Sequence, residues 1–218
     1  MGSVPLGLLV ARGLYGMDIR RYGTGGAGAS NVLHNVGLLP AALVGLGIFL
    51  QGLLPPLVVS LFGASEVAVA AAAVGAVVGY DWPVFLGFRA ENARGVGVST
   101  GAAVAIFPPG AVPLLLMYAL GRSLKQMALG VLLGFVAYVA SAYYLGAPPA
   151  VMVAALLLLI LIVLRRVEGV GQDLERGDLL SVLADRLLFD RRPGQRLTGS
   201  ADRESRDRRQ GRRPGKGG

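Results

Sequence analysis

Three long stretches of this chain contain no Lys, Arg, Asp or Glu: residues 22–65, 95–121 and 126–164. A helix that crosses the hydrocarbon of a bilayer needs about 20 consecutive apolar residues, so each stretch has room for at least one such helix. The composition agrees, with 54% hydrophobic and 16% charged residues and a mean hydropathy of +0.60. We therefore expect an all-α, polytopic integral membrane helical bundle rather than a soluble domain.

Glycine- and proline-rich turns divide these apolar stretches into candidate spans. The two short segments around Pro108–Pro109 are also compatible with a single kinked helix. The first segment is short for a full span, and we expect that its outer turns are missing from this sequence. The expected spans are residues 1–15, 37–62, 66–87, 97–107, 109–121, 126–146 and 149–165.

The distribution of charge favours seven passes with the N-terminus outside. In that arrangement Glu66 is the only charged residue on one face of the membrane. Merging the two short segments would send Lys125 and the C-terminal tail to opposite faces. Cytoplasmic loops of membrane proteins are rich in Lys and Arg. We therefore expect about seven transmembrane helices, with the face that carries most of the Lys and Arg residues in the cytoplasm. That face carries Arg20, Arg21, Arg89, Arg94, Arg122, Lys125 and the tail arginines.

The C-terminal part of the chain differs in character from the membrane domain, which we expect to cover residues 1–177. Apolar side chains repeat at helical spacing in 178–190, which predicts an amphipathic helix on the inner leaflet. Residues 191–218 have the composition of a disordered basic tail, either weakly attracted to anionic lipid or simply solvated. From Arg165 onward there are 14 Lys and Arg against 9 Asp and Glu, with no aromatic residue after Phe189. Nucleic acid is therefore not an expected partner.

The segment 16–37, GMDIRRYGTGGAGASNVLHNVG, is a polar, glycine-dense loop between two apolar segments. Glycines let backbone N–H groups approach a ligand closely, and Arg20 and Arg21 add fixed positive charge. The simplest ligand for such a loop is a phosphate at a membrane surface. The alternative is a glycine-rich turn whose arginines only set the topology.

Two more polar segments, 79–100 and 121–126, are expected on the same face. They also combine glycine, cations and hydroxyls, which is the chemistry of holding phosphate, although any inner loop collects arginines. The chain has no cysteine and one histidine, His34, and these segments contain no paired carboxylates or Ser-His-Asp set. We expect no metal and no organic cofactor.

These segments resemble the motifs of the PlsY family, bacterial membrane acyltransferases that move a fatty acyl group from acyl phosphate to glycerol 3-phosphate. The resemblance extends to about residue 177. The residues that match the family's first motif are Gly2, Ser3, Pro5, Gly7, Arg12, Gly16, Asp18, Ile19, Arg20, Gly23, Gly25, Gly28, Ala29 and Asn31. The residues that match its second motif are Gly79, Pro83, Val84, Phe85, Leu86 and Phe88. Arg89 lies at the motif's first basic position, and Arg94–Gly95–Val96 lie at its later Lys-Gly-Val positions.

The resemblance implies a membrane acyltransferase that makes lysophosphatidate and phosphate at the cytoplasmic face of a bacterial plasma membrane. Its small-molecule partners would be acyl phosphate and glycerol 3-phosphate, with membrane lipid around it and without a protein nucleophile. The residues that the resemblance implies as catalytic are Arg20, Thr24 and Asn31. The residues that it implies for phosphate binding are Ser3, Arg20, Gly23, Gly25, Gly28, Ser30, Arg89, Arg94, Gly95 and Ser123.

The chain departs from the family pattern at several places, which leaves an alternative open. Gly26 replaces an asparagine of the first motif, and Tyr80 replaces the histidine of the second. The third motif reads RRVEGV at 165–170, without its histidine and asparagine. A catalytically degenerate relative that binds lipid phosphate or another membrane protein is the alternative. A transporter of anionic solutes is disfavoured, because the spans offer almost no charge along a polar path.

Overall fold

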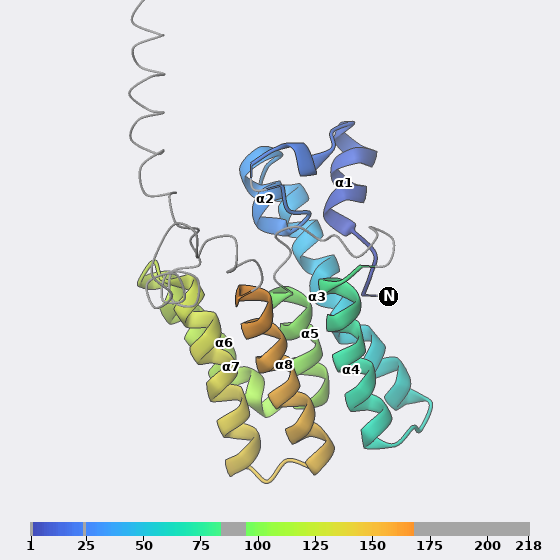
Figure 1. Cartoon of the computed structure of the whole chain (residues 1–218), viewed down its shortest axis with the longest axis vertical. Coiled ribbons are helices and arrows are strands. Elements are labelled where there is room, and N and C mark those ends of the chain that lie inside the picture. The colour runs from blue at the N-terminus through green and yellow to red at the C-terminus, as the bar shows by residue number, and fades with distance from the viewer. Residues whose placement is uncertain (1, 24, 84–94, 168–218) are drawn as a thin grey trace, which may run out of the picture. The chain divides into compact units, whose positions relative to one another are not determined.

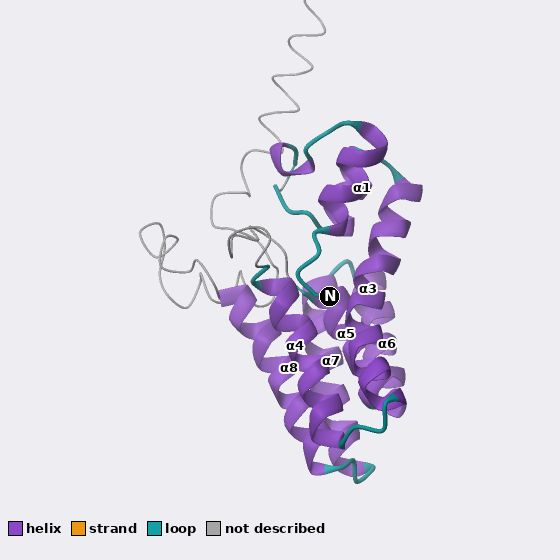
Figure 2. Ribbon diagram, turned by 90° about the vertical axis from the view of Figure 1, so that its right-hand side faces the viewer, coloured by secondary structure: helices purple, strands orange, loops and turns teal. Residues whose placement is uncertain are grey.

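A computed structural model describes residues 2–23, 25–83 and 95–167, and these residues fold into helices without a strand (Figure 1, Figure 2). The expected all-α fold is confirmed for this part of the chain. The segments predicted at 178–190 and 191–218, and the boundary at 177, lie outside the described residues. The elements in chain order are α1 (Leu6–Tyr15), the 3₁₀ turn η1 (Ile19–Arg21), α2 (Ala29–Asn35), α3 (Leu38–Leu61), α4 (Glu66–Asp81), α5 (Val96–Ile106), α6 (Pro108–Ser123), α7 (Met127–Tyr144) and α8 (Pro149–Val167).

Within the described ranges, three helices are long and apolar enough to cross a membrane: α3, α7 and α8. They have 24, 18 and 19 residues, and their bounds agree with three of the predicted spans to within two residues. The helices α4 and α6 have 16 residues each, and α5 has 11. The fold is that of a polytopic membrane protein, while the count of seven spans stays a prediction.

Two of the predicted spans have one boundary that differs by several residues from the helix found in its place. The first was expected from residue 1, but α1 begins at Leu6 and has 10 residues. The segment before α1 contacts α3 instead of extending the helix, because the carbonyl of Val4 accepts a hydrogen bond of 2.8 Å from the Gln51 side chain of α3. The span expected at 66–87 ends as a helix at Asp81, two residues before Pro83, and its last residues lie outside the described part.

The boundary between α5 and α6 settles the alternative of one kinked helix. Phe107 separates the two helices with φ −153° and ψ 80°, which is outside the helical region. The residue before a proline is pushed out of the helical region, and Pro108 then fits the first position of a new helix. The two short segments are therefore separate helices.

Glycines allow two pairs of helices to pack with their backbones in contact. A Cβ atom at Gly52 of α3 would clash with the carbonyl of Val98 on α5, and one at Gly101 would clash with that of Phe49. On α6 and α7, an added Cβ at Gly121 would lie 2.7 Å from the Cα of Gly130. Such small-residue contacts are typical of helices that associate in lipid.

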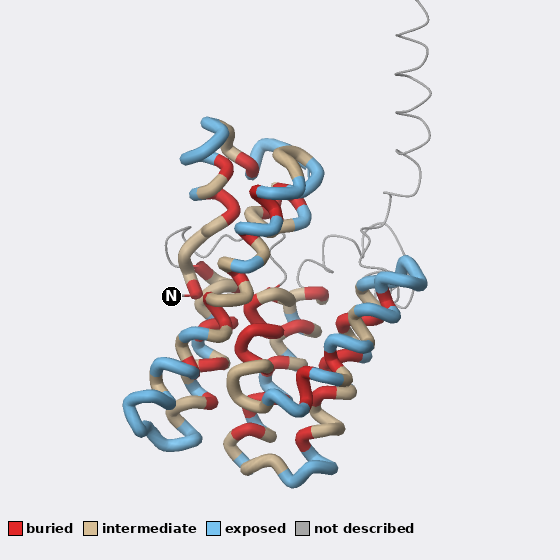
Figure 3. Tube along the Cα trace, turned by 180° about the vertical axis from the view of Figure 1, so that it is seen from behind, coloured by how far each residue is buried: buried red, intermediate tan, exposed pale blue. Residues whose placement is uncertain are grey.

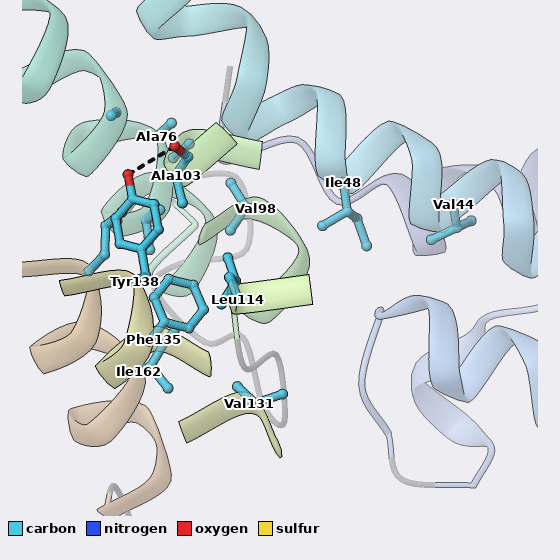
Figure 4. Packing of buried hydrophobic residues seen from close by; sticks show 14 of the residues in the cluster. Val44, Ile48, Ala76, Val98, Ala103, Leu114, Val131, Phe135, Tyr138 and Ile162 are labelled. Atoms are coloured by element: carbon cyan, nitrogen blue, oxygen red, sulfur yellow. Dashed lines mark hydrogen bonds between the residues drawn. The ribbon is translucent and has the colours of Figure 1, made fainter. Parts of the chain in front are cut away.

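The packed interior contains the large side chains of α7 and their neighbours on α5 and α6 (Figure 4). Leu114, Phe135 and Tyr138 are fully buried, and the Tyr138 hydroxyl donates a hydrogen bond of 2.9 Å to the Ala103 carbonyl. Burial alternates with exposure along the helices (Figure 3). Many large apolar side chains are exposed, such as Leu116 at 61%. An apolar outer surface suits contact with hydrocarbon and is unusual for a protein in water.

Candidate active site

The polar loop begins where α1 ends. Gly16 adopts the left-handed conformation, with φ +65°, and its N–H donates to the Arg12 carbonyl at 3.2 Å. Met17 N–H donates to the Ala11 carbonyl, also at 3.2 Å. This is a usual way for a helix to end at glycine. The turn brings the chain directly to Asp18 and η1.

Asp18 holds the side chain of Arg20 in a two-point contact. The Arg20 Nε donates to Oδ1 at 2.9 Å, and one terminal nitrogen donates to Oδ2 at 2.7 Å. The Arg20 backbone N–H also donates to Oδ1, at 3.2 Å, so that Asp18 caps the short 3₁₀ turn. Paired bonds of this type fix both the position and the plane of a guanidinium group.

The pair leaves Arg20 able to contact a ligand. Its side chain is 47% exposed, and a guanidinium has five N–H donors, of which Asp18 takes two. The hydrogen bond from Arg20 holds the pKa of the Asp18 carboxyl well below its usual range, and the same contact raises the pKa of Arg20. Both groups therefore stay charged at neutral pH.

Asn31 ties the loop together from the first turn of α2. Its side-chain nitrogen donates to three backbone carbonyls, which belong to Ile19 at 3.1 Å, Tyr22 at 3.0 Å and Gly26 at 2.8 Å. Its side-chain oxygen accepts a hydrogen bond of 2.9 Å from Asn35. Only 5% of Asn31 is exposed. These contacts give the amide a structural task, namely holding both sides of the loop.

The glycines of the loop meet two requirements of its backbone. Gly23 and Gly25 have φ values of +57° and +74°, where residues with a Cβ are strained. Gly23 also has no room for a side chain, because a Cβ would lie 2.6 Å from Nδ2 of Asn35. Gly28 is the N-cap of α2 in an extended conformation, and Ser30 is exposed in the first turn of that helix.

Ser3 lies away from this loop, in the segment that leads into α1. The hydroxyl of Ser3 is 3.3 Å from the position that a Cβ would occupy on Gly79, near the end of α4. Gly2 also packs on α4, where a Cβ would contact the Ala76 carbonyl. The start of the described chain is thus anchored on α4, and by Val4 on α3.

Gly95 lies against a buried carboxylate at the end of α4. It is the N-cap of α5 with φ +56°, and a Cβ there would lie 2.5 Å from Oδ1 of Asp81. Only 1% of Asp81 is exposed. The same oxygen is 3.8 Å from Nε of Arg165 on α8. Two predicted phosphate contacts, Ser3 and Gly95, therefore border the last residues of α4.

The arginines at the end of α8 join this junction to its neighbours. The guanidinium of Arg165 lies 5.3 Å from the ring centroid of Trp82, a cation–π distance. Arg166 is 5% exposed and donates to the Ala128 carbonyl at the start of α7, at 2.8 Å. The buried charges near the ends of α4 and α8 are thus matched by opposite charge, an aromatic face or a carbonyl.

The described residues place the predicted site residues in three locations. Arg20, Gly23, Gly25, Gly28, Ser30 and Asn31 share the loop between α1 and α3, and Ser3 and Gly95 border α4. Ser123 ends α6, where its hydroxyl donates to the Ala119 carbonyl of the same helix at 2.9 Å. Thr24, Arg89 and Arg94 lie outside the described residues. Their proposed roles stay predictions.

Sequence reasoning missed Asp81, because the motif comparison treated its position as variable. A physical signal was available, since Asp81 ends a stretch of α4 that has no charge after Glu66. A carboxylate at such a position must find a cation when it becomes buried. In the part of the chain that the structure describes, no three His, Cys, Asp or Glu side chains gather as a metal site.

Membrane-length helices and a glycine-rich loop that presents a fixed arginine define an integral membrane protein with a cationic polar loop. Comparisons with known proteins narrow this class. The family model described as glycerol-3-phosphate acyltransferase matches residues 1–172. The chain therefore belongs to the glycerol-3-phosphate acyltransferase family.

Curated relatives carry the same name. A glycerol-3-phosphate acyltransferase of Rubrobacter xylanophilus is 45% identical over 109 residues, which cover 50% of this chain and 53% of that protein. One of Thermus thermophilus is 36% identical over 151 residues, 67% of this chain and 73% of the relative. The chain thus spans about half the length of the Rubrobacter relative.

A solved structure agrees with the fold. The crystal structure of PlsY, described as an integral membrane glycerol 3-phosphate acyltransferase in its glycerol 3-phosphate form, superposes with a TM-score of 0.68. The two sequences are 30% identical, and the match covers 84% of this chain and 92% of PlsY. The helical arrangement is therefore shared over most of both chains.

Proposed function

We propose that this protein transfers a fatty acyl group from acyl phosphate to glycerol 3-phosphate, giving lysophosphatidate and phosphate for phospholipid biosynthesis. Membership of the family supports the reaction class. The name of the solved neighbour supports glycerol 3-phosphate as acceptor. The acyl-phosphate donor follows from the resemblance of the sequence motifs to the PlsY pattern.

The observation that carries the proposal is the two-point contact between Asp18 and Arg20. In the proposed step a hydroxyl oxygen of glycerol 3-phosphate attacks the acyl carbonyl carbon, and the carbonyl–phosphate bond breaks. The hydroxyl proton leaves to the departing phosphate or to water. A guanidinium of fixed orientation can stabilise the charge that grows on the leaving phosphate, without reorganising during the reaction. Because acyl phosphate is already activated, positioning supplies much of the remaining rate.

The other site residues have supporting roles in this proposal. The hydroxyls of Thr24 and Ser30 orient phosphate oxygens, while Gly23, Gly25 and Gly28 give the loop its shape. Asn31, with its three carbonyl contacts, acts by holding that shape. The further phosphate contacts that we propose are Ser3, Arg89, Arg94, Gly95 and Ser123.

The proposed location is the plasma membrane of a bacterium, with the reaction and the C-terminal tail on the cytoplasmic side. The concentration of Lys and Arg in alternate loops supports this orientation. Fusion of a reporter that is active only in the periplasm, placed after Arg192, is expected to give no signal. An active fusion at that position would contradict seven spans with the N-terminus outside.

The function is tested by the release of phosphate from palmitoyl phosphate by purified protein, with and without glycerol 3-phosphate. We expect release that depends on the acceptor and falls at least tenfold in Arg20→Ala, a loss of about 1.4 kcal/mol of transition-state stabilisation. Glu66→Gln, which alters an exposed charge at the start of α4 outside the motifs, is the control. Absence of release by well-folded protein would favour the catalytically degenerate relative.

A further inference from the structure

The junction at the ends of α4 and α8 contains a charge that the proposed reaction does not use. Of the acidic residues in the described part of the chain, Asp18 and Asp81 each contact an arginine, whereas Glu66 is exposed at the start of α4. Asp18 lies on the surface loop. Asp81 is 1% exposed, so its charge is screened little by water.

The carboxylate of Asp81 lies beside two predicted phosphate contacts. Gly95 touches it directly, since a Cβ on Gly95 would come within 3.0 Å of the carboxyl carbon. Ser3 packs against Gly79, two residues earlier on α4. A negative charge this close to Gly95 and Ser3 repels a phosphate, and the repulsion is strong in a poorly solvated region. A phosphate can therefore approach only if the charge is cancelled.

Arg165 is placed to cancel that charge. Its Nε lies 3.8 Å from Oδ1 of Asp81, a distance that is too long for a hydrogen bond but still within the range of an ion pair. Its side chain is 7% exposed and lies over the ring of Trp82. The contact thus depends on charge and placement more than on hydrogen-bond direction.

We propose that Asp81 and Arg165 are positioning residues that tune phosphate affinity: Arg165 cancels the charge of Asp81 beside Gly95 and Ser3. The ion pair links the end of α4 to α8 and places a positive charge beside the buried carboxylate. This inference rests on the proposed acyl transfer, because the affinity in question is that for glycerol 3-phosphate and acyl phosphate.

A double-mutant cycle tests the inference through the KM of each phosphate substrate. Arg165→Gln leaves the buried carboxylate without this compensation, and we expect KM to rise about tenfold with a smaller change in kcat. Asp81→Asn together with Arg165→Gln removes both charges, and KM is expected to return to within about threefold of the wild-type value. A purely structural pair would instead lower the melting temperature of Arg165→Gln and leave the KM of its folded fraction unchanged.

Conservative and control variants keep the test decisive if Arg165→Gln fails to fold. Arg165→Lys keeps the charge and is expected to hold KM within about threefold of wild type. Glu66→Gln alters an exposed carboxylate at the start of α4, away from the proposed phosphate contacts, and is expected to leave KM unchanged. Melting curves and gel filtration in detergent identify variants that are not folded.

The outcomes separate this inference from the proposed function. An inactive wild-type protein overturns both. Active wild type with a double variant as impaired in KM as Arg165→Gln overturns the inference alone. A rise in KM for Arg165→Lys equal to that for the glutamine variant does the same.

Discussion

Replacing Asn31 by alanine removes the side chain that holds the polar loop. The amide has two hydrogens, which three carbonyl oxygens share at 2.8 to 3.1 Å. Each net hydrogen bond contributes about 1 kcal/mol, and a buried carbonyl left without a partner costs about 1–3 kcal/mol more. Because water can reach part of the opened loop, we expect a local loss of about 3 kcal/mol. That loss raises the population of the open loop roughly 100-fold.

Limited proteolysis by trypsin measures this opening. Arg20 and Arg21 are exposed trypsin sites, and the next Lys or Arg along the chain is Arg89. A cut in the loop therefore gives a defined fragment that begins at Arg21 or Tyr22. We expect Asn31→Ala to increase the cleavage rate by at least tenfold, since cleavage follows the equilibrium population of the open form. Acyl transfer should fall in parallel.

Two further variants grade the effect. Asn31→Asp keeps the size of the side chain but replaces donors by acceptors that face three carbonyls, so it should be at least as damaging as alanine. Asn35→Ala removes only the donor to the carbonyl and side-chain oxygens of Asn31, and we expect a change of tenfold or less. If trypsin cleaves Asn31→Ala at a rate within threefold of the wild-type rate, the amide does not hold the loop. A fall in kcat with unchanged cleavage would instead assign Asn31 to catalysis.

Three other predictions follow from particular contacts. Because the hydrogen bond from Arg20 keeps the pKa of Asp18 below its usual value of about 3.9, its stabilisation is complete above that pH and is lost as the pH falls below it. Protection of the loop amides against hydrogen exchange, measured relative to their intrinsic rate at each pH, should thus fall below about pH 4 in wild type, and protection that does not change with pH would contradict this. Gly52→Ala puts a Cβ on the Val98 carbonyl and should cost about 2 kcal/mol or more of stability in a detergent melt. Gly75→Ala, with open space around it, should be neutral or stabilising. Tyr138→Phe loses the hydrogen bond to Ala103 and should lower stability by about 1 kcal/mol without unfolding; no change in the melt would show that bond to be unimportant.

The extent of the apolar helices could be predicted because their cause is local. Residues 38–61 are uncharged and bounded by glycines 37 and 63, so the predicted span 37–62 differs from α3 by one residue at each end. The start of α1 was not predictable in this way. The backbone before Leu6 is held by Gln51, 47 positions further along the chain from Val4. No pattern within residues 1–15 carries information about that contact.

The candidate site shows the same division between local and distant causes. The pairing of Asp18 with Arg20 lies within three residues, and the motif that contains both was visible in the sequence. The task of Asn31 was not visible, because an asparagine that binds a ligand and one that binds backbone carbonyls look alike in a motif. Asp81 and Arg165 are far apart in the sequence, and only the packed bundle brings them together.

Trp82 is the single tryptophan of the protein, and the guanidinium of Arg165 lies on its ring. The tryptophan fluorescence of the purified protein therefore originates from one place, the junction between α4 and α8. Its emission wavelength and intensity offer a label-free optical signal for events at this junction. Titration with glycerol 3-phosphate could then be followed directly, before any assay of turnover.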